Sequence, residues 1–287
     1  MNSREFLREV LDSNECPENF SEIFKDFQIY QGLVWDTLKE FHRICEKNNI
    51  SYQLSYGSLL GIIRDGGQIP WDYDVDVLVS YEAKEQLISA LEKDLDDKYY
   101  FYCPETNPKC RHVIMRLAPR GYRTEMLHVD VFYFIGVPDN AIERKRYVDK
   151  VKNISKKRYY KLVKIREEAD GNFHKLLFLI KNKLWTLFVP LSKIDSEYNR
   201  LCDKYSAVRT EACVSADSYA DWYYFPSEYL KETKLIETQD GVWRIPVEYD
   251  KLLKIIYGDY EQVPPIEDRI EELLFHYRRL KFFETSR

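Results

Sequence analysis

The sequence predicts an α+β fold, with a mixed sheet and flanking helices in the first half and a mostly helical second half packed on it. Two observations predict this class. Up to about residue 140, segments with alternating apolar residues are interleaved with segments whose apolar residues recur every three or four positions. After Pro138 the spacing becomes mainly helical, and residues 144–183 hold fourteen lysines and arginines against four acidic residues.

The composition is that of an ordinary globular protein. The chain has 287 residues, of which 45% are hydrophobic and 32% are charged. Its net charge of −5 argues against nucleic-acid binding, which would need a basic excess. The six cysteines are far apart and form no C-x-x-C pair, as is usual in a reducing compartment. No run of about 18 apolar residues occurs, so we expect no membrane-spanning helix. The cysteine usage leads us to expect a cytoplasmic protein.

The first half supplies the strands of the predicted sheet. An amphipathic helix is predicted over 31–49, and a β-prone run follows that ends at Gly57–Ser58. The next helix stops at Gly66 and Gly67, because glycine ends helices readily. Alternation of aspartate and valine then predicts a strand over 74–79. A further helix is predicted over 82–97, and further strands over 99–103, 111–118 and 126–135.

The second half is predicted to be mainly helical. One helix is expected over 174–191, with Pro190 at its end. A helical or mixed segment is expected over 194–216, and strand-like pieces such as 241–249 follow it. Two more helices are predicted over 248–257 and 267–283.

Three aspartates form the candidate metal site. Asp74 and Asp76 alternate on one predicted strand, so both project from one face, and two such carboxylates repel each other unless a cation lies between them. Asp130 lies on a later strand and reaches the same edge if the two strands are neighbours. Three carboxylates so placed could hold two Mg²⁺ or Mn²⁺ ions, an arrangement used for phosphoryl transfer. The alternative is a solvated strand face, although aspartate forms strands poorly.

Gly57 and Ser58 stand where a predicted strand ends and a helix begins. Free backbone N–H groups and the positive end of the helix dipole suit a phosphate at such a junction. Gly-Ser, a helix, Asp-x-Asp and a distant third aspartate together form the pattern of the nucleotidyltransferase-like fold.

The stretch YGSLLGIIRDGGQIPWDYDVDV, residues 56–77, resembles the signature of the LicD family, which also includes the fukutin-related proteins. HVDVFYF at 128–134 and IPVEYDKLLKIIYGDYEQVPP at 245–265 look like two further motifs of that family. The resemblance covers about residues 31 to 270 in order. It departs at Ser58, where threonine is common, and at Tyr73, where a third aspartate is frequent; the second departure suggests that position 73 is no essential ligand.

The resemblance implies a metal-dependent phosphotransferase. Family members move a phospho-alcohol, such as phosphocholine or a polyol phosphate, from a CDP-activated donor to a glycan hydroxyl, and CMP leaves. Asp74, Asp76 and Asp130 would then hold Mg²⁺ or Mn²⁺, in two sites, and Asp130 could accept the proton of the attacking hydroxyl. The implied acceptors are cell-surface glycans such as lipopolysaccharide, teichoic acid or capsule, or their lipid-linked precursors.

These motifs suggest a division of the chain that still forms one structural unit. We expect an N-terminal extension (1–30), a nucleotidyltransferase-like catalytic core (31–140), a basic helical insertion (141–216) and a C-terminal part that completes the cleft (217–287).

Other residues near the motifs are candidates for substrate binding. Arg64 is within reach of phosphate, or else forms a surface salt bridge. Trp71 either stacks on the donor or sugar or is buried. The role of Asp72 is open between a water-bridged metal contact, a partner for Arg64 and a turn cap. Arg116, with Arg111, could reach the donor phosphates.

Tyr257 and Asp259 belong to the C-terminal motif, so a substrate contact is one interpretation, and a helix-ending turn at Gly258 and Asp259 is the other. His112 and His128 are expected in supporting or core positions. An aromatic cluster could cage a quaternary ammonium group or could simply pack; its members are Tyr219, Trp222, Tyr223 and Tyr224.

The basic segment contains an apolar stripe over residues 173–188 with lysines around it. Such a helix could contact an anionic membrane surface, which would suit a lipid-linked acceptor at the inner face of the membrane. The favoured alternative is that the stripe packs on the α/β core.

Two other functions remain open at this point. A nucleotidyltransferase would use an NTP and release pyrophosphate instead of CMP. A sugar- or nucleotide-binding protein would keep the fold without catalysis, although the complete set of three aspartates argues against it.

Overall fold

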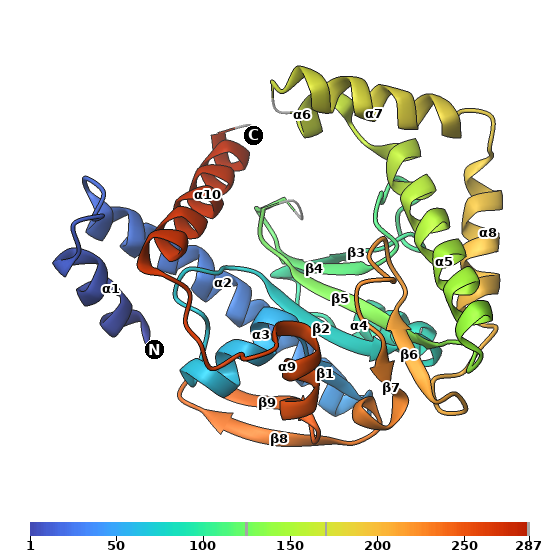
Figure 1. Cartoon of the computed structure of the whole chain (residues 1–287), viewed down its shortest axis with the longest axis horizontal. Helices are drawn as coiled ribbons and strands as arrows, with labels where there is room; N and C mark the ends of the chain where they lie inside the picture. The colour runs from blue at the N-terminus through green and yellow to red at the C-terminus, as the bar shows by residue number, and fades with distance from the viewer. Residues whose placement is uncertain (124–125, 170, 286–287) are drawn as a thin grey trace.

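The computed structural model describes residues 1–123, 126–169 and 171–285, and its centre is a seven-stranded mixed sheet (Figure 1). Five strands follow the order β1-β2-β5-β4-β3, and β6 pairs with β5 and with β7. β2 and β5 run parallel, and the other pairs are antiparallel. The strands are Tyr52–Leu54 (β1), Val75–Ser80 (β2), Tyr99–Tyr102 (β3), Met115–Pro119 (β4), Val129–Gly136 (β5), Ala212–Ser215 (β6) and Phe225–Pro226 (β7). The α+β class and the four strands expected between residues 74 and 135 are confirmed.

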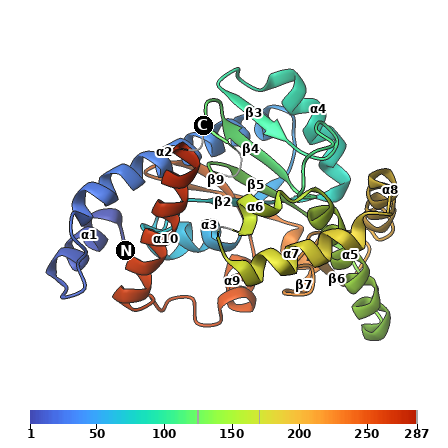
Figure 2. The ribbon, with the colours of Figure 1, turned by 90° about the horizontal axis from the view of Figure 1, so that it is seen from above.

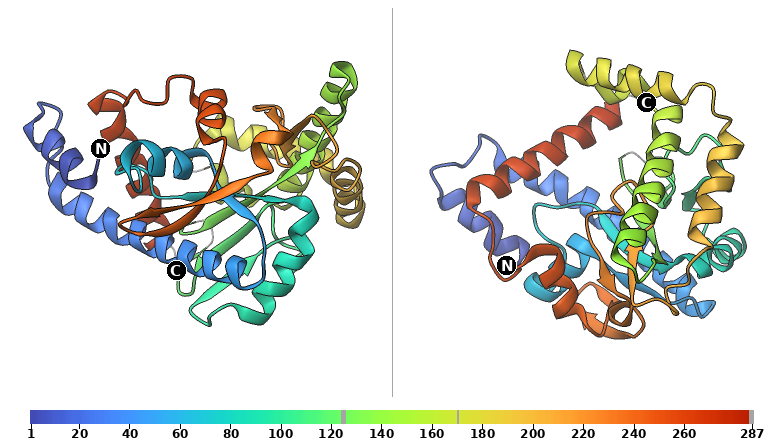
Figure 3. Two further views of the ribbon diagram at one scale, coloured as in Figure 1. Left: turned by 90° about the horizontal axis from the view of Figure 1, so that it is seen from below. Right: turned by 45° about the vertical axis from the view of Figure 1, so that its right-hand side comes forward.

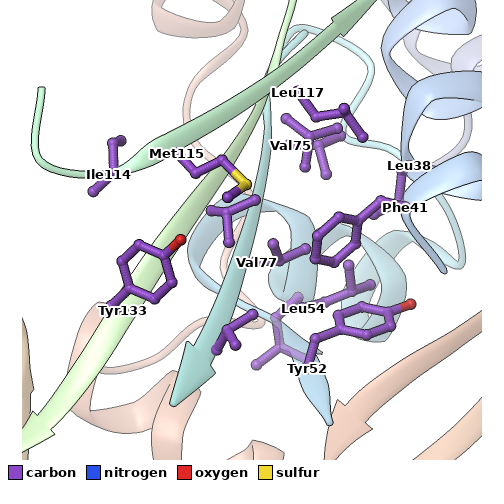
Figure 4. Packing of buried hydrophobic residues seen from close by; sticks show 14 of the residues in the cluster. Leu38, Phe41, Tyr52, Leu54, Val75, Val77, Ile114, Met115, Leu117 and Tyr133 are labelled. Atoms are coloured by element: carbon purple, nitrogen blue, oxygen red, sulfur yellow. The ribbon is translucent and has the colours of Figure 1, made fainter. Parts of the chain in front are cut away.

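One long helix, α2 (Phe20–Lys47), covers one face of the sheet, as the view from below in Figure 3 shows. Leu38 and Phe41 of α2 lie with Val75 and Val77 of β2 in the buried core (Figure 4). Successive strand residues point to opposite faces, so the aspartate between the two valines faces away from α2. The apolar alternation of the strand therefore directs its carboxylates to the other face.

The helix predicted over 31–49 begins earlier, at Phe20, and so crosses the boundary expected at residue 30. Phe6 of α1 (Ser3–Asp12) packs on Phe20 and Phe24 with ring centroids 6.2 and 5.6 Å apart. The first thirty residues therefore share the main core. The helices that follow β1 and β2 are α3 (Tyr56–Leu60), continued by a π-helical turn at Gly61–Asp65, and α4 (Lys84–Asp94).

The helices between β5 and β6 pack on one another beside the sheet (Figure 1). α5 (Ala141–Leu162) packs against α8 (Leu191–Cys202), and α6 (Ile165–Ala169) and α7 (Phe173–Thr186) stand farthest from the sheet (Figures 1 and 2). The prediction that a helix ends at Pro190 is wrong: α7 ends at Thr186, and Pro190 is the cap residue that precedes α8.

The C-terminal part completes the structure. A hairpin of β8 (Thr233–Thr238) and β9 (Gly241–Pro246) packs through Trp243, whose ring centroid lies 5.0 Å from that of Trp35 in α2. The two predicted C-terminal helices are confirmed as α9 (Tyr249–Tyr257) and α10 (Ile266–Thr285). All six cysteines are free thiols. No helix in the described residues is both long and apolar enough to cross a membrane.

Candidate active site

The candidate site is a row of polar side chains across four neighbouring strands. Asp76 of β2 pairs with Asp130 of β5, Asp130 pairs with Arg116 of β4, and Arg116 pairs with Tyr102 of β3. Directly paired residues on adjacent strands project from the same face. These four side chains therefore lie side by side on the face that α2 leaves free, and we call them the carboxylate row.

Asp130 is held tightly within this row. Arg116 donates from Nε to Oδ1 at 2.7 Å and from Nη2 to Oδ2 at 3.4 Å, and His128 Nε2 lies 3.4 Å from Oδ2. Burial alone would raise the pKa of Asp130, but the charges of Arg116 and His128 and their hydrogen bonds outweigh it and hold that pKa well below its usual range. Asp130 is therefore an ionised carboxylate with both oxygens engaged.

The pKa values of Asp72, Asp74 and Asp76 are shifted in the opposite direction to that of Asp130. Burial and then mutual repulsion raise the pKa values of Asp74 and Asp76 well above the usual range. Burial, with the charge of Glu272 adding to it, raises the pKa of Asp72 to about 6. A nearby cation or a shared proton stabilises carboxylates that are held together in this way.

The start of α3 is fixed against the start of β2. The Ser58 hydroxyl accepts the backbone N–H of Asp76 at 2.8 Å, and the Ser55 N–H donates to the Asp76 carbonyl at 3.0 Å. A Cβ at Gly57 would lie 2.9 Å from Oδ2 of Asp72, so a larger residue here would displace that carboxylate from its present position. Gly57, Ser58 and the aspartates thus form one unit, as their sequence order predicted.

Arg64 and Trp71 have partners inside the protein. Arg64 donates to Asp65 through Nη2 at 2.7 Å, and both side chains are buried. The Trp71 side chain is 3% exposed, with its ring 5.3 Å from that of Phe6 and 5.7 Å from the Arg64 guanidinium carbon. Of the interpretations left open, the buried one describes Trp71. The ion pair of Arg64 exists, but in the interior and not at the surface.

Tyr257 and Asp259 lie in different environments in the structure. Tyr257 ends α9 with 41% of its surface exposed; loss of water around the rest of the side chain, and then the negative charges of Asp76 and Asp72, raise its pKa, so it lies near the aspartates. Asp259 is exposed and accepts a hydrogen bond from Gln262 at 2.8 Å. Gly258 between them has a φ of 68°, as in a helix-ending turn.

The structure adds residues that sequence reasoning did not select. Buried Asp217 follows β6 and accepts the Ser215 hydroxyl at 2.7 Å. Burial raises the pKa of Asp217, and the charge of Asp130 adds to this rise, so the two carboxylates are near one another. The alternation of Ser215 and Asp217, which continues the pattern of a strand, was the available signal. Tyr56 lies between Ser215 and Asp217 on one side and the aromatic cluster on the other, with its ring 6.2 Å from that of Tyr223.

The donor chemistry of the site suits a hard cation. Asp74 and Asp76 offer carboxylate oxygens, and their raised pKa values show that their charges lack compensation. In the part of the chain that the structure describes, however, no three His, Cys, Asp or Glu side chains are positioned to hold an ion together. The salt bridge from Arg116 to Asp130 would have to loosen for that aspartate to act as a ligand.

Part of the chain that contains this site is similar to known proteins. Residues 49–166, which include α3 and the whole carboxylate row, match the model of the LicD/FKTN/FKRP nucleotidyltransferase domain. Over 255 residues, the chain is 25% identical to the lipopolysaccharide cholinephosphotransferase LicD of Haemophilus influenzae, covering 83% of this chain and 92% of that protein. A 49-residue stretch is 39% identical to an uncharacterized protein of Rickettsia prowazekii, covering 17% of this chain and 18% of that protein. Residues 49–166 of this chain therefore resemble the nucleotidyltransferase domain of the LicD family.

Proposed function

We propose that this protein transfers a phospho-alcohol, with phosphocholine as the first candidate, from a CDP-activated donor to a hydroxyl of a cell-surface glycan or its precursor. The observation that carries the proposal is the cluster of Asp72, Asp74 and Asp76, with raised pKa values, beside the start of α3. The 25% identity to a lipopolysaccharide cholinephosphotransferase supports phosphocholine as the transferred group and a glycan as the acceptor.

Asp74 and Asp76 would hold Mg²⁺ or Mn²⁺, and Asp130 would join a second site once its contact with Arg116 loosens. A bound cation would supply neutralisation of the charge that develops on the two phosphates of the donor. Gly57 and the first turn of α3 would lie against the donor. Arg116 would remain close enough to contact a phosphate oxygen.

The acceptor hydroxyl would attack the phosphorus that carries the alcohol. A new P–O bond forms to the acceptor, the P–O bond to CMP breaks, and CMP leaves with the electron pair. Asp130 is a poor proton acceptor because its pKa is held well below the usual range. Asp72, with a pKa of about 6, is better matched to take the proton at neutral pH, so we assign that role to Asp72 instead of Asp130.

Phosphocholine is preferred because of the aromatic side chains near the site. Tyr219 and Trp222 are exposed, with ring centroids 4.4 Å apart, and the N–H of Tyr219 donates to Asp217 at 2.5 Å. Aromatic faces attract a quaternary ammonium group more strongly than a neutral polyol, because the cation adds an electrostatic attraction to the ring. Trp222→Ala should therefore raise the KM for CDP-choline and leave the KM for CDP-glycerol or CDP-ribitol unchanged.

The decisive experiment measures product release. The protein is incubated with Mg²⁺, a panel of CDP-alcohols and lipopolysaccharide, and CMP and pyrophosphate are quantified. Asp74→Asn and Asp76→Asn should lower CMP release by at least 100-fold, whereas the matched Asp259→Asn should not. Pyrophosphate release from an NTP would establish the nucleotidyltransferase instead, and no turnover with any donor would leave a binding protein.

Cation binding is tested without turnover. Mg²⁺ or Mn²⁺ should raise the Tm of the wild-type protein and of Asp259→Asn, because a cation relieves the repulsion between Asp74 and Asp76. Asp74→Asn and Asp76→Asn should lose most of that rise. An unchanged wild-type Tm at millimolar cation would contradict the metal assignment.

We further propose that α7 contacts an anionic membrane surface. Its apolar stripe does not pack on the core, because Phe173, Leu177, Ile180 and Leu184 are exposed and Phe188, just beyond the helix, is 95% exposed. The helix packs instead through Leu179, together with the partly buried Leu176 of the stripe, on a small cluster separate from the main core. The local excess of ten positive charges over residues 144–183 favours anionic lipid over a neutral partner.

Flotation with phosphatidylglycerol vesicles tests this contact. Wild-type protein should float with these vesicles and not with pure phosphatidylcholine. Leu184→Gln combined with Phe188→Gln should abolish flotation, and Leu235→Gln, an exposed leucine of β8, should not. A dimer in solution that this double variant dissociates would show that a second copy covers the stripe, and would overturn the membrane proposal.

A further inference from the structure

A basic pocket adjoins the carboxylate row on its β3–β4 side. The cavity has a volume of about 450 Å³, enough for a sugar or a phosphate group. Tyr102 and Arg116 reach it from the strands. Lys109, Arg111 and His112 line it from the loop between β3 and β4, and Lys164 from the segment after α5.

The pocket carries more positive charge than its neighbours neutralise. Arg111 lies 3.4 Å from Glu168, and Lys164 lies 3.2 Å from Glu167. Arg116 is paired with Asp130 at 2.7 Å, whereas the exposed Lys109 side chain has no ion-pair partner in the described ranges.

The environment of His112 agrees with this charge distribution. Burial, followed by the charges of Arg116 and Arg111, lowers the pKa of His112 well below its usual value. An anion in the pocket would meet several charge-assisted hydrogen-bond donors, which are among the stronger contacts that a protein offers.

The order of the strands separates this pocket from the start of α3. Along the sheet order β1-β2-β5-β4-β3, Asp76 and Asp130 occupy the middle, α3 packs on β2, and the pocket begins at β4. In a phosphoryl transfer the attacking and leaving oxygens lie on opposite sides of the phosphorus. A donor against Gly57 and α3 would therefore leave the β4 side to the attacking molecule.

We propose that this basic pocket binds a negatively charged group of the acceptor, a sugar phosphate or a sugar carboxylate. The inference rests on the proposed function, which assigns the α3 side to the donor. It narrows the acceptor from glycans in general to anionic glycans. The diphosphate of the donor has the same chemistry and is the competing source of such a group.

The probes are glucose 6-phosphate, glucuronate and neutral glucose, titrated into the whole protein by calorimetry. The two anions should bind at least tenfold more tightly than glucose. Lys109→Glu combined with Lys164→Glu should weaken anion binding at least tenfold. Lys93→Glu, an exposed lysine of α4, is the matched control and should leave binding unchanged. All variants should keep the wild-type Tm within about 2 °C.

A second titration in saturating CDP-choline and Mg²⁺ separates the two sources. Glucose 6-phosphate should still bind, and the double variant should keep the wild-type affinity for CDP-choline. Displacement of the sugar phosphate by CDP-choline would assign the pocket to the donor, and equal binding of glucose and glucose 6-phosphate would remove the anion site. Either result overturns the proposal. A protein that releases no CMP but binds the anions through Lys109 and Lys164 would refute the transfer reaction alone.

Discussion

At the scale of single residues, the site holds carboxylates that the fold does not neutralise. The pKa of Asp72 is raised to about 6, so the folded protein retains a proton that the unfolded chain loses near pH 4. The contribution of Asp72 to stability is therefore most favourable below about pH 4, falls as the pH rises to about 6, and stays constant above that. A carboxylate that lowers the stability of the fold at neutral pH, as Asp72 does, is typical of a functional site.

We therefore expect Asp72→Asn to stabilise the protein while impairing transfer. In EDTA at pH 7.5 the free energy of unfolding in urea should rise by about 3 kcal/mol, and at pH 4 it should hardly change. CMP release should fall at the same time, since the variant cannot accept the proton. Asp259→Asn, at an exposed position, should show neither effect. An equal gain at both pH values would mean that the charge of Asp72 is not the cause.

Ser58 has a structural role that can be separated from phosphate binding. Its hydroxyl is buried and accepts the Asp76 N–H at 2.8 Å. Ser58→Ala would leave that donor unpaired and should lower the free energy of unfolding by about 1–3 kcal/mol. Ser58→Thr keeps the acceptor and should retain stability and activity. A stable but inactive Ser58→Ala variant would instead favour a direct contact with substrate.

The sequence was sufficient to place the carboxylates but not their partners. Alternation predicts that Asp74 and Asp76 share a face of a strand, because a period of two is a local property. The pairing of Arg116 with Asp130 depends on the register between β4 and β5, which local patterns do not determine. The low pKa of Asp130 follows from that register, and so the proton-accepting role expected for this residue could not be judged beforehand.

At the scale of elements, α7 shows what a periodic pattern predicts and what it leaves open. Apolar residues at three- and four-residue steps predicted the helix and its stripe. Nothing in the pattern says which surface the stripe meets, and the favoured packing on the α/β core is wrong. Leu179, about a quarter turn away from that stripe, is the buried contact, in a small cluster with Val163 and Ala169.

This arrangement predicts unequal losses of stability for two substitutions in the same segment. Leu179→Ala should lower the free energy of unfolding by about 2 kcal/mol, because it leaves a cavity in that cluster. Phe188→Ser should change it by less than about 0.5 kcal/mol, because the ring is 95% exposed. Urea denaturation of both variants checks the pair. A large loss from Phe188→Ser would mean that the stripe is part of the packed core.

At the scale of the whole molecule, α1 and α10, from opposite ends of the chain, meet beside Trp71 in the loop that carries the aspartates. Arg269 of α10 is buried and lies over the rings of Phe6, at 5.7 Å, and Trp71, at 5.3 Å. Its guanidinium also donates to both carboxylate oxygens of Glu9 in α1, at 2.5 and 3.0 Å. Trp71 immediately precedes Asp72, so the contact of Arg269 with Trp71 holds the loop in place without touching the aspartates. Local patterns could not predict a contact between residues 260 positions apart.

We expect Arg269→Ala to weaken both the fold and the reaction. Loss of the buried guanidinium removes the bidentate pair and the contact with Trp71, and should lower the free energy of unfolding by about 2–4 kcal/mol. CMP release should fall mainly through kcat, because the aspartates lose their position while the surfaces that bind donor and acceptor remain. Arg269→Lys keeps the charge but cannot form the planar bidentate pair, so it should restore only part of both losses. Glu9→Gln, which weakens the same pair without touching Trp71, is the control. If it reduces kcat as much as Arg269→Ala does, then the ion pair, and not the stacking on Trp71, holds the loop.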